Sequence, residues 1–157
     1  MSITNGCGLH MATKFNFSWK GLEEYIDKLD SMNADGITKR GVFDGGEVMY
    51  NEIKSATMAL KVGKGGNVNE VQYQGLISSL GYTKMKLSNG RWSTRIGFND
   101  YNADGDPNPL VANYVNSGTS RQAPTHFVDN AVKRAKAKCE QAIRERIETD
   151  INNLMKE

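Results

Sequence analysis

Oxygen-bearing side chains suited to a hard metal ion occur at alternate positions in one short segment. Asp100, Asn102 and Asp104 are followed directly by Gly105. This D-x-N-x-D-G pattern matches the opening of a calcium loop, in which glycine permits the sharp turn. The twelfth position of such a loop supplies a bidentate glutamate, but here it is Val111. We therefore expect an Asx-rich turn in this segment and assign no metal site to it, and a calcium-dependent protein is a further alternative hypothesis.

Cysteine and histidine are too few and too scattered to indicate a zinc site. Cys7 and His10 have the spacing of half a site, and the only other candidates are His126 and Cys139. A structural zinc site normally needs four ligands brought together. Cys139 also belongs to an apolar stripe, where a small buried residue is the simpler interpretation. We expect no zinc and no other cofactor.

Nucleophilic catalysis and phosphate binding lack their usual sequence contexts. A catalytic serine or cysteine needs an adjacent base and an orienting group, and no G-x-S-x-G pattern is present. The glycine-rich run Gly63-Lys64-Gly65-Gly66 lacks the spacing of a phosphate-binding loop. We expect this run to be a turn, and we expect no enzymatic activity.

Two groups of basic side chains could contact phosphate, since such contacts need only clustered cations. They are Lys84, Lys86, Arg91 and Arg95 in the middle of the chain, and Lys133, Arg134, Lys136 and Lys138 near its end. Acidic residues follow the second group closely, so a solvated helix face with i,i+4 ion pairs is the competing interpretation. A DNA-binding module that uses both groups is therefore the alternative hypothesis for function.

Composition and charge bound the class of protein. The chain has 157 residues, of which 38% are hydrophobic and 24% are charged, and its formal net charge is +2. That length suits one ordinary core, and the charge balance does not by itself predict nucleic-acid or membrane binding. No apolar run approaches the roughly 20 residues that cross a bilayer, and no secretory signal is recognisable. We expect a flexible leader over 1–12 and a single cytoplasmic domain over 13–157.

Hydrophobic spacing predicts helices in the first half of that domain. After a short strand over 15–17, the pattern indicates a helix over 19–31, which the turn-forming residues 33–36 end. A second helical pattern covers 38–62, and a short helix is expected over 69–79. Glycines that disfavour helix by about 1 kcal/mol each interrupt the second pattern at Gly41, Gly45 and Gly46. Either that helix breaks there, or a neighbour approaches its backbone closely.

The clearest local signal is Asn89-Gly90, the dipeptide favoured in a two-residue type I′ hairpin turn. This turn predicts the cross-strand pairs Leu87 with Trp92, Met85 with Thr94, and Thr83 with Ile96. Antiparallel partners point to the same side, so all six side chains are expected on one face of the ribbon. The four basic residues of the segment are then expected on the other face.

A loop over 99–109 is expected to lead into two further helices. Asn108 is expected to cap a short helix that begins at Pro109 and ends at Gly118, and Thr125 to cap a long final helix. The apolar side of the short helix is Leu110, Val111, Tyr114 and Val115. The stripe of the final helix is Phe127, Ala131, Val132, Ala135, Cys139, Ala142, Ile143, Ile147, Ile151 and Leu154. About 30 residues at about 1.5 Å each exceed what one small domain covers, so part of the stripe is expected to meet another subunit.

Three short motifs follow one another in the second half of the chain. They are IGFNDY at 96–101, GDPNPLVA at 105–112 and SGTS at 117–120, with Ala123-Pro124 and Phe127 after them. Their order and spacing resemble the tail-component family of tailed double-stranded-DNA bacteriophages, which is assigned to tail completion or head–tail joining. Gly21-Leu22 and Ile53-Lys54 also fit the family. The resemblance covers 14–155 and is most specific over 96–127. Thr125-His126 and the leader depart from the family pattern.

The resemblance implies an α+β fold similar to tail terminators, with a small antiparallel β-sheet packed with helices and a long C-terminal helix. It implies a structural virion protein of the neck that forms a homo-oligomeric ring, expected to be a hexamer. The implied partners are head-closure or connector proteins, tail-tube proteins and, non-specifically, packaged DNA, with no membrane. No catalytic residues are implied.

Two sets of residues are candidates within such a ring. The most family-like loop supplies a candidate subunit interface, and the alternative is that this loop only shapes the subunit core. The candidate interface residues are Ser117, Gly118, Thr119, Ser120, Arg121 and Phe127. The candidate charges for lining a DNA channel are Lys84, Lys86, Arg91, Arg95, Lys133, Arg134 and Lys136.

Overall fold

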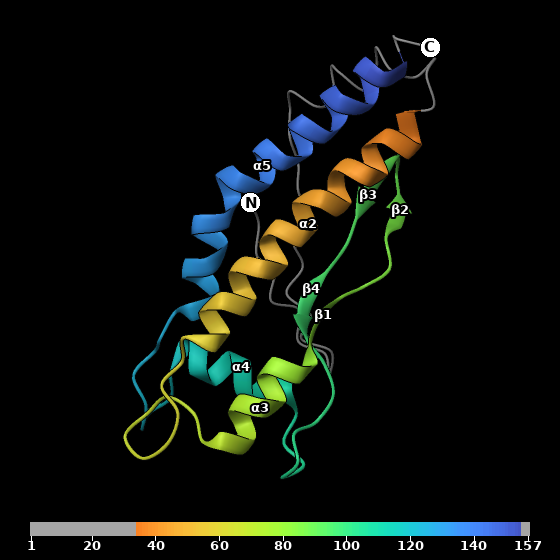
Figure 1. Ribbon diagram of the computed structural model, residues 1–157. Helices are drawn as coiled ribbons and strands as arrows, with labels where there is room; N and C mark the ends of the chain where they lie inside the picture. Colours follow the sequence, from red (N-terminus) through yellow and green to blue (C-terminus); the bar gives the residue numbers. More distant parts are fainter. Residues whose placement is uncertain (1–33, 155–157) are drawn as a thin grey trace.

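The computed structural model describes residues 34–154, which form the expected α+β fold with a long C-terminal helix (Figure 1). Its helices are α2 (Ala34–Met58), α3 (Glu70–Ser79), α4 (Asn108–Ser117) and α5 (Phe127–Leu154). Strand β1 (Leu80–Tyr82) pairs antiparallel with β4 (Ile96–Phe98), and β2 (Lys86–Ser88) pairs antiparallel with β3 (Arg91–Ser93). The leader and the elements predicted over 15–17 and 19–31 lie outside the described residues.

Helices α2 and α5 lie side by side and run in opposite directions, as Figure 1 shows. Helix α2 is unbroken, because its glycines admit α5 of the same chain. A Cβ built on Gly45 would lie 2.7 Å from Cγ1 of Ile143, and one on Gly41 would lie 3.2 Å from Cγ1 of Ile147. Of the two alternatives drawn from the sequence, a broken helix or a close approach to its backbone, the close approach is therefore correct.

The predicted start of this helix was wrong. Helix α2 begins at Ala34, so residues 34–36 of the turn-forming cluster lie inside it. The first turns are held by packing, since Ile37 is buried against Ile143 and Ile147. Tertiary packing outweighs the local turn preference of these residues.

The apolar stripe of α5 is covered mainly by α2 of the same chain. Its fully buried members are Phe127, Ala131, Val132, Ala135, Cys139, Ile143 and Ile147, while Ala142 and Ile151 are partly buried. The expectation that the length of α5 requires a second subunit was therefore wrong for the described stripe. Helix α2, with 25 residues against the 28 of α5, is long enough to cover most of the stripe.

The hairpin forms with the predicted turn but not with a uniform register. Asn89 and Gly90 both have positive φ, at 52° and 70°, and Leu87 pairs with Trp92 as expected. Farther from the turn, however, Ile96 pairs with Tyr82, where the sequence predicted Thr83.

A bulge accounts for the shift of one residue. The Thr83 amide donates to the Arg95 carbonyl at 2.8 Å, which leaves Lys84 and Met85 opposite Thr94 alone. The bulge turns Tyr82 to the side of the buried Ile96, and an unshifted ladder would have brought Thr83 there instead.

Helix α3 and the end of α4 follow local rules, whereas the start of α4 does not. The Asn69 side chain accepts from the Gln72 amide, which completes a capping box and confirms the helix predicted over 69–79. Gly118, with φ of 79°, ends α4 as predicted. Asn108 is no cap, because it lies inside the first turn and its buried amide group donates to the Asn99 carbonyl.

Two further expectations near these helices were wrong. Leu110 is 48% exposed and does not belong to the apolar side of α4. Thr125 is not the main cap of α5, because it lies two positions before Phe127 and its hydroxyl, which donates to the Val115 carbonyl at 2.7 Å, accepts from the Phe127 amide only at 3.4 Å. The cap comes instead from α4, where Asn116 Oδ1 accepts from the Val128 amide at 3.0 Å. A residue twelve positions away along the chain thus satisfies the helix terminus.

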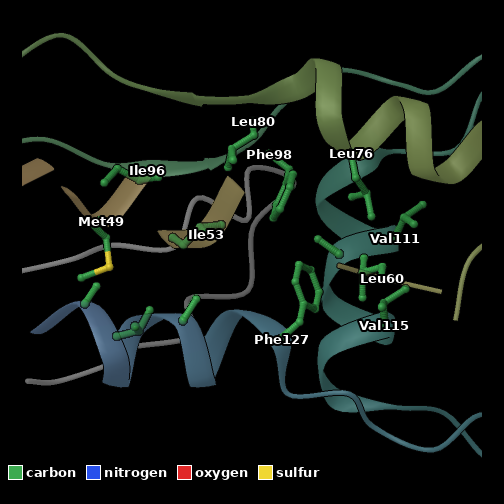
Figure 2. Packing of buried hydrophobic residues seen from close by; sticks show 14 of the residues in the cluster. Met49, Ile53, Leu60, Leu76, Leu80, Ile96, Phe98, Val111, Val115 and Phe127 are labelled. Atoms are coloured by element: carbon green, nitrogen blue, oxygen red, sulfur yellow. The ribbon is translucent and has the colours of Figure 1, made fainter. Parts of the chain in front are cut away.

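The main core lies where α2, α3, α4 and α5 meet the inner side of the ribbon, as Figure 2 shows at close range. Met49 and Ile53 enter it from α2, and Leu76 enters from α3. The Phe98 ring packs against the Phe127 ring at a centroid distance of 6.2 Å. The segment 96–127 therefore supplies a large part of this core.

Candidate assembly surfaces

The loop between α4 and α5 is a tight and internally bonded structure. Gly118 is closely packed, since a Cβ built on it would lie 2.8 Å from the Pro124 nitrogen. The amides of Thr119 and Gln122 donate to each other's carbonyl oxygens. The Gln122 side chain also donates to the Asn67 carbonyl at 2.7 Å, which ties this loop to the glycine-rich loop after α2. The backbone of this loop is therefore fixed by the subunit itself.

The candidate interface residues of this loop separate into two groups. Phe127 is 6% exposed and packs in the core, so it offers little surface to a neighbour, and Gly118 shapes the turn. The exposed members are Ser117, Thr119, Ser120 and Arg121. The loop thus shapes the subunit core, and it also presents a polar tip to the outside.

The loop before α4 is organised by one asparagine side chain. Asn102 Oδ1 accepts from the amides of Asp104 at 3.0 Å and Asp106 at 2.9 Å. The oxygen that a calcium loop would turn toward its ion is therefore engaged with the backbone, as expected of an Asx-rich turn. Within 34–154, no group of three His, Cys, Asp or Glu side chains is placed to hold a metal ion.

The same loop presents a surface that is both acidic and apolar. The side chains of Asp100, Asp104 and Asp106 are exposed. Two large apolar side chains are exposed beside them, Tyr101 at 66% and Leu110 at 48%. No ion pair to a described residue engages any of the three carboxylates.

Half of the basic group on α5 is engaged with an acidic residue of α2. Glu52 accepts from Lys138 Nζ at 2.6 Å and lies 3.6 Å from Arg134 Nε. The hydrogen bond from Lys138 is the main cause that lowers the pKa of Glu52, with smaller contributions from the Lys138 charge and from Arg134. Lys133 and Lys136 are exposed on the same helix. This arrangement favours the solvated face with ion pairs over a continuous phosphate-binding surface.

The basic residues of the ribbon lie on a different part of the molecule. Lys84, Lys86, Arg91 and Arg95 are all exposed, but the bulge at Lys84 and Met85 breaks the uniform alternation that predicted one common side for them. Helix α2 lies between the ribbon and most of α5 in Figure 1. The structure therefore does not bring the two basic groups together on one surface of the subunit.

A row of aromatic side chains along the boundary between α2 and the ribbon was not identified from the sequence. Tyr82 packs edge to face on Phe43 at 5.9 Å and on Tyr50 at 5.6 Å, yet Tyr82 is 47% exposed. Near the turn, Lys39 Nζ lies 5.0 Å above the Trp92 ring. The spacing of seven between Phe43 and Tyr50, on a face away from the α5 contact, is the signal that could have revealed it.

Cys139 is a buried packing residue, as predicted. Its side chain has no exposed surface, and burial raises the pKa of its thiol to about 11. A protonated, buried thiol is a poor nucleophile and a poor metal ligand. The cysteine therefore contributes to the contact between α5 and α2, where Gly45 approaches its carbonyl.

No helix within the described residues has the length and apolar character needed to cross a membrane.

Comparison with known proteins does not place the chain in a family. No family model, no curated protein and no solved structure matches this chain.

Proposed function

We propose that this protein is a structural component of the virion of a tailed bacteriophage. It acts at the head–tail junction, in tail completion or head–tail joining, as a subunit of a homo-oligomeric ring. It assembles in the host cytoplasm, contacts head-closure or connector proteins and tail-tube proteins, and carries out no catalytic chemistry.

The observation that carries the proposal is that the phage-like segment folds as one bonded unit. Asn108 donates to the Asn99 carbonyl, so the IGFNDY and GDPNPLVA motifs are joined. Asn116 caps α5, and Thr125 donates to the Val115 carbonyl, so the SGTS loop is joined to the final helix. Motifs that are specific only in their order and spacing thus correspond to one structural unit, which supports a common origin for the whole segment.

The charge distribution favours a structural role over the alternative DNA-binding module. Arg134 and Lys138 are engaged with Glu52, and α2 separates the remaining α5 cations from those of the ribbon. Strong non-specific DNA binding requires several uncompensated cations that track one phosphate backbone. Lys84, Lys86 and Arg95 make no ion pair with a described residue and remain as the cations that could face packaged DNA or a neighbouring subunit in a ring.

Electron microscopy of lysates tests the proposal directly. The gene is disrupted in the parent phage or prophage, and the same gene supplied in trans is the control. We expect full heads beside unattached or over-length tails, with normal particles restored by the control. Over-length tails would indicate termination, and normal-length free tails would indicate joining. Intact infectious particles in normal numbers from the disrupted strain would refute the proposal.

A binding assay separates the alternative function. The purified protein is titrated with double-stranded DNA at two salt concentrations. A structural ring subunit predicts weak binding at most. Strong binding that falls steeply with salt, and that is lost when Lys84 and Lys86 are changed to Glu, would favour the DNA-binding module.

A further inference from the structure

We propose that two different surfaces of this chain bind each other between neighbouring copies, head to tail. The first, the ribbon seam, consists of Lys39, Phe43, Tyr82, Lys84, Lys86 and Leu87. The second, the acidic loop patch, consists of Asp100, Tyr101, Asp104, Asp106 and Leu110. The inference deepens the proposed function, on which it rests, by naming the contact that builds the ring.

The ribbon seam combines exposed apolar side chains with uncompensated positive charge. Phe43 is 38% exposed, Tyr82 47% and Leu87 43%, and each is large. Lys84 lies between β1, which ends at Tyr82, and β2, where Lys86 directly precedes Leu87, and both lysines are exposed. Neither lysine makes an ion pair with any described residue. Exposed apolar groups flanked by polar ones are typical of a protein-binding surface.

The acidic loop patch has the complementary composition. Its three carboxylates are exposed and lack described ion-pair partners, and Tyr101 and Leu110 supply the apolar component. The backbone beneath it is fixed, because Asn102 accepts from two amides of the loop and Asn108 donates to the Asn99 carbonyl. A surface that is already ordered loses little conformational entropy when it binds.

The separation of the two surfaces requires contact between different copies. The acidic loop follows β4, whereas β2, which carries Lys86 and Leu87, lies toward the turn at the other end of the ribbon (Figure 1). Because the two surfaces differ, their contact is heterologous, so each copy retains one surface for the next copy on either side. Repetition of such a contact closes into a ring when the rotation between copies permits it.

Charge complementarity identifies a second copy as the occupant. DNA could neutralise the lysines of the seam, but it would be repelled by the acidic loop patch. Only a partner with both signs of charge satisfies both surfaces, and this chain carries both. The ion pairs among the described residues, such as Arg40 with Asp150 at 2.7 Å, join residues of the same subunit. These residues therefore need no oppositely charged partner from a neighbouring copy.

Reciprocal charge reversal tests the contact. The seam variant carries Lys84→Glu and Lys86→Glu, and the loop variant carries Asp104→Lys and Asp106→Lys. A fourfold variant carries all four changes. The matched control carries Lys133→Glu and Lys136→Glu, the same charge change on exposed lysines of α5. Association of the purified full-length chains is measured by sedimentation velocity, and folding is checked by circular dichroism and thermal melting.

We expect the wild type and the control to associate alike, with association that weakens as salt rises. The seam variant and the loop variant should each associate about tenfold more weakly or worse, because like charges then face each other. Association should return in an equal mixture of the two variants and in the fourfold variant. A monomeric wild type, unaffected single variants, or no recovery in the mixture or the fourfold variant would overturn the inference.

Failure of this contact can be told apart from failure of the proposed function. If the disrupted phage lacks joined tails but the variants associate normally, the contact is refuted and the function stands. If the disrupted phage makes normal particles while charge reversal still controls association, the function is refuted and the contact stands.

Discussion

The contact between α2 and α5 differs from the edge of the β-ribbon in how completely its side chains are buried and its charges are paired within one chain. Between the helices, Gly41 and Gly45 admit isoleucine side chains of α5, and Glu52 is bonded to Lys138. Along the ribbon, large side chains such as Tyr82 and Leu87 are about half exposed. The two lysines beside them lack described acidic partners.

The two regions separate surfaces that stabilise the folded subunit from surfaces that one chain leaves exposed. A contact that buries small and apolar groups closely and pairs its charges stabilises the isolated subunit. A surface that leaves aromatic groups half exposed and charges uncompensated gains free energy only when a partner covers it. Mutations on the two sides of α2 should therefore have separable effects on stability and on association.

The largest expected effect is on stability, at the core side of α2. Ile53 is 1% exposed, so Ile53→Ala should lower the free energy of unfolding by about 2–5 kcal/mol through lost burial and a cavity. Leu87→Ser, at the exposed edge of the ribbon, should change it by less than about 0.5 kcal/mol. Urea denaturation of both variants measures the two values. Similar losses in both would contradict the distinction between the two regions.

A smaller effect is expected from one methyl group added on either side of α2. At Gly45 the new Cβ would lie 2.7 Å from Ile143 Cγ1, so Gly45→Ala should cost about 1–2 kcal/mol after the gain in helix propensity. At Gly46 the nearest atom is the Thr94 methyl at 3.2 Å, so Gly46→Ala should lie within about 0.5 kcal/mol of the wild type.

The adjacent glycines control for each other, since the change and the helix are the same. Thermal unfolding of both variants at one pH is the measurement. If Gly45→Ala proves at least as stable as Gly46→Ala, the close approach of α2 and α5 does not limit residue size at position 45.

The smallest effect is the pH dependence of the Glu52 contact. Because the pKa of Glu52 is lowered in the folded state, the unfolded state binds more protons near its ordinary value of 4.5. The stabilisation is therefore present above that pH and is lost as pH falls through the lowered folded pKa. Its size should not exceed about 1 kcal/mol, because Lys138 is largely exposed.

Glu52→Gln removes this contribution, and Glu47→Gln on the same helix is the control. The stability difference between the wild type and Glu52→Gln, measured by denaturation from pH 7 to pH 3, should shrink toward acid pH and at high salt. The control should show no such trend, since Glu47 makes no ion pair with described residues. A constant difference for Glu52→Gln would show that the ion pair does not stabilise the helix contact.

Local chemistry made several parts of this fold predictable. The Asn89-Gly90 turn, the helix after Asn69 and the stop at Gly118 each depend on residues within a few positions of one another. The periodic apolar stripe of α5 likewise predicted which of its side chains are buried. The exposed charges of the ribbon followed from the alternation of side chains about the turn.

Features that depend on distant residues were not predictable. The bulge opposite Thr94 sets Leu80 opposite Phe98 in the core, and no residue near Lys84 indicates it. The sequence indicated Thr125 as the cap of α5, because Thr125 is close to the helix start along the chain. The cap that forms, Asn116, belongs to another helix. The aromatic row on α2 and the ribbon joins Phe43 to Tyr82 across 39 positions, with no motif to connect them.

The types of most described elements, the hairpin turn, the Asx-rich loop and the buried face of α5 could be derived from the sequence alone, because each depends on short-range geometry and periodic burial. Only the tertiary structure decided that α2 is continuous, that it covers the stripe of α5, and that one residue is bulged from the ribbon. Only the tertiary structure also separated the basic groups and left the ribbon seam and the acidic loop patch exposed. The physical reason is that packing and charge pairing are settled between segments far apart in the chain, where local preference carries no information about the partner.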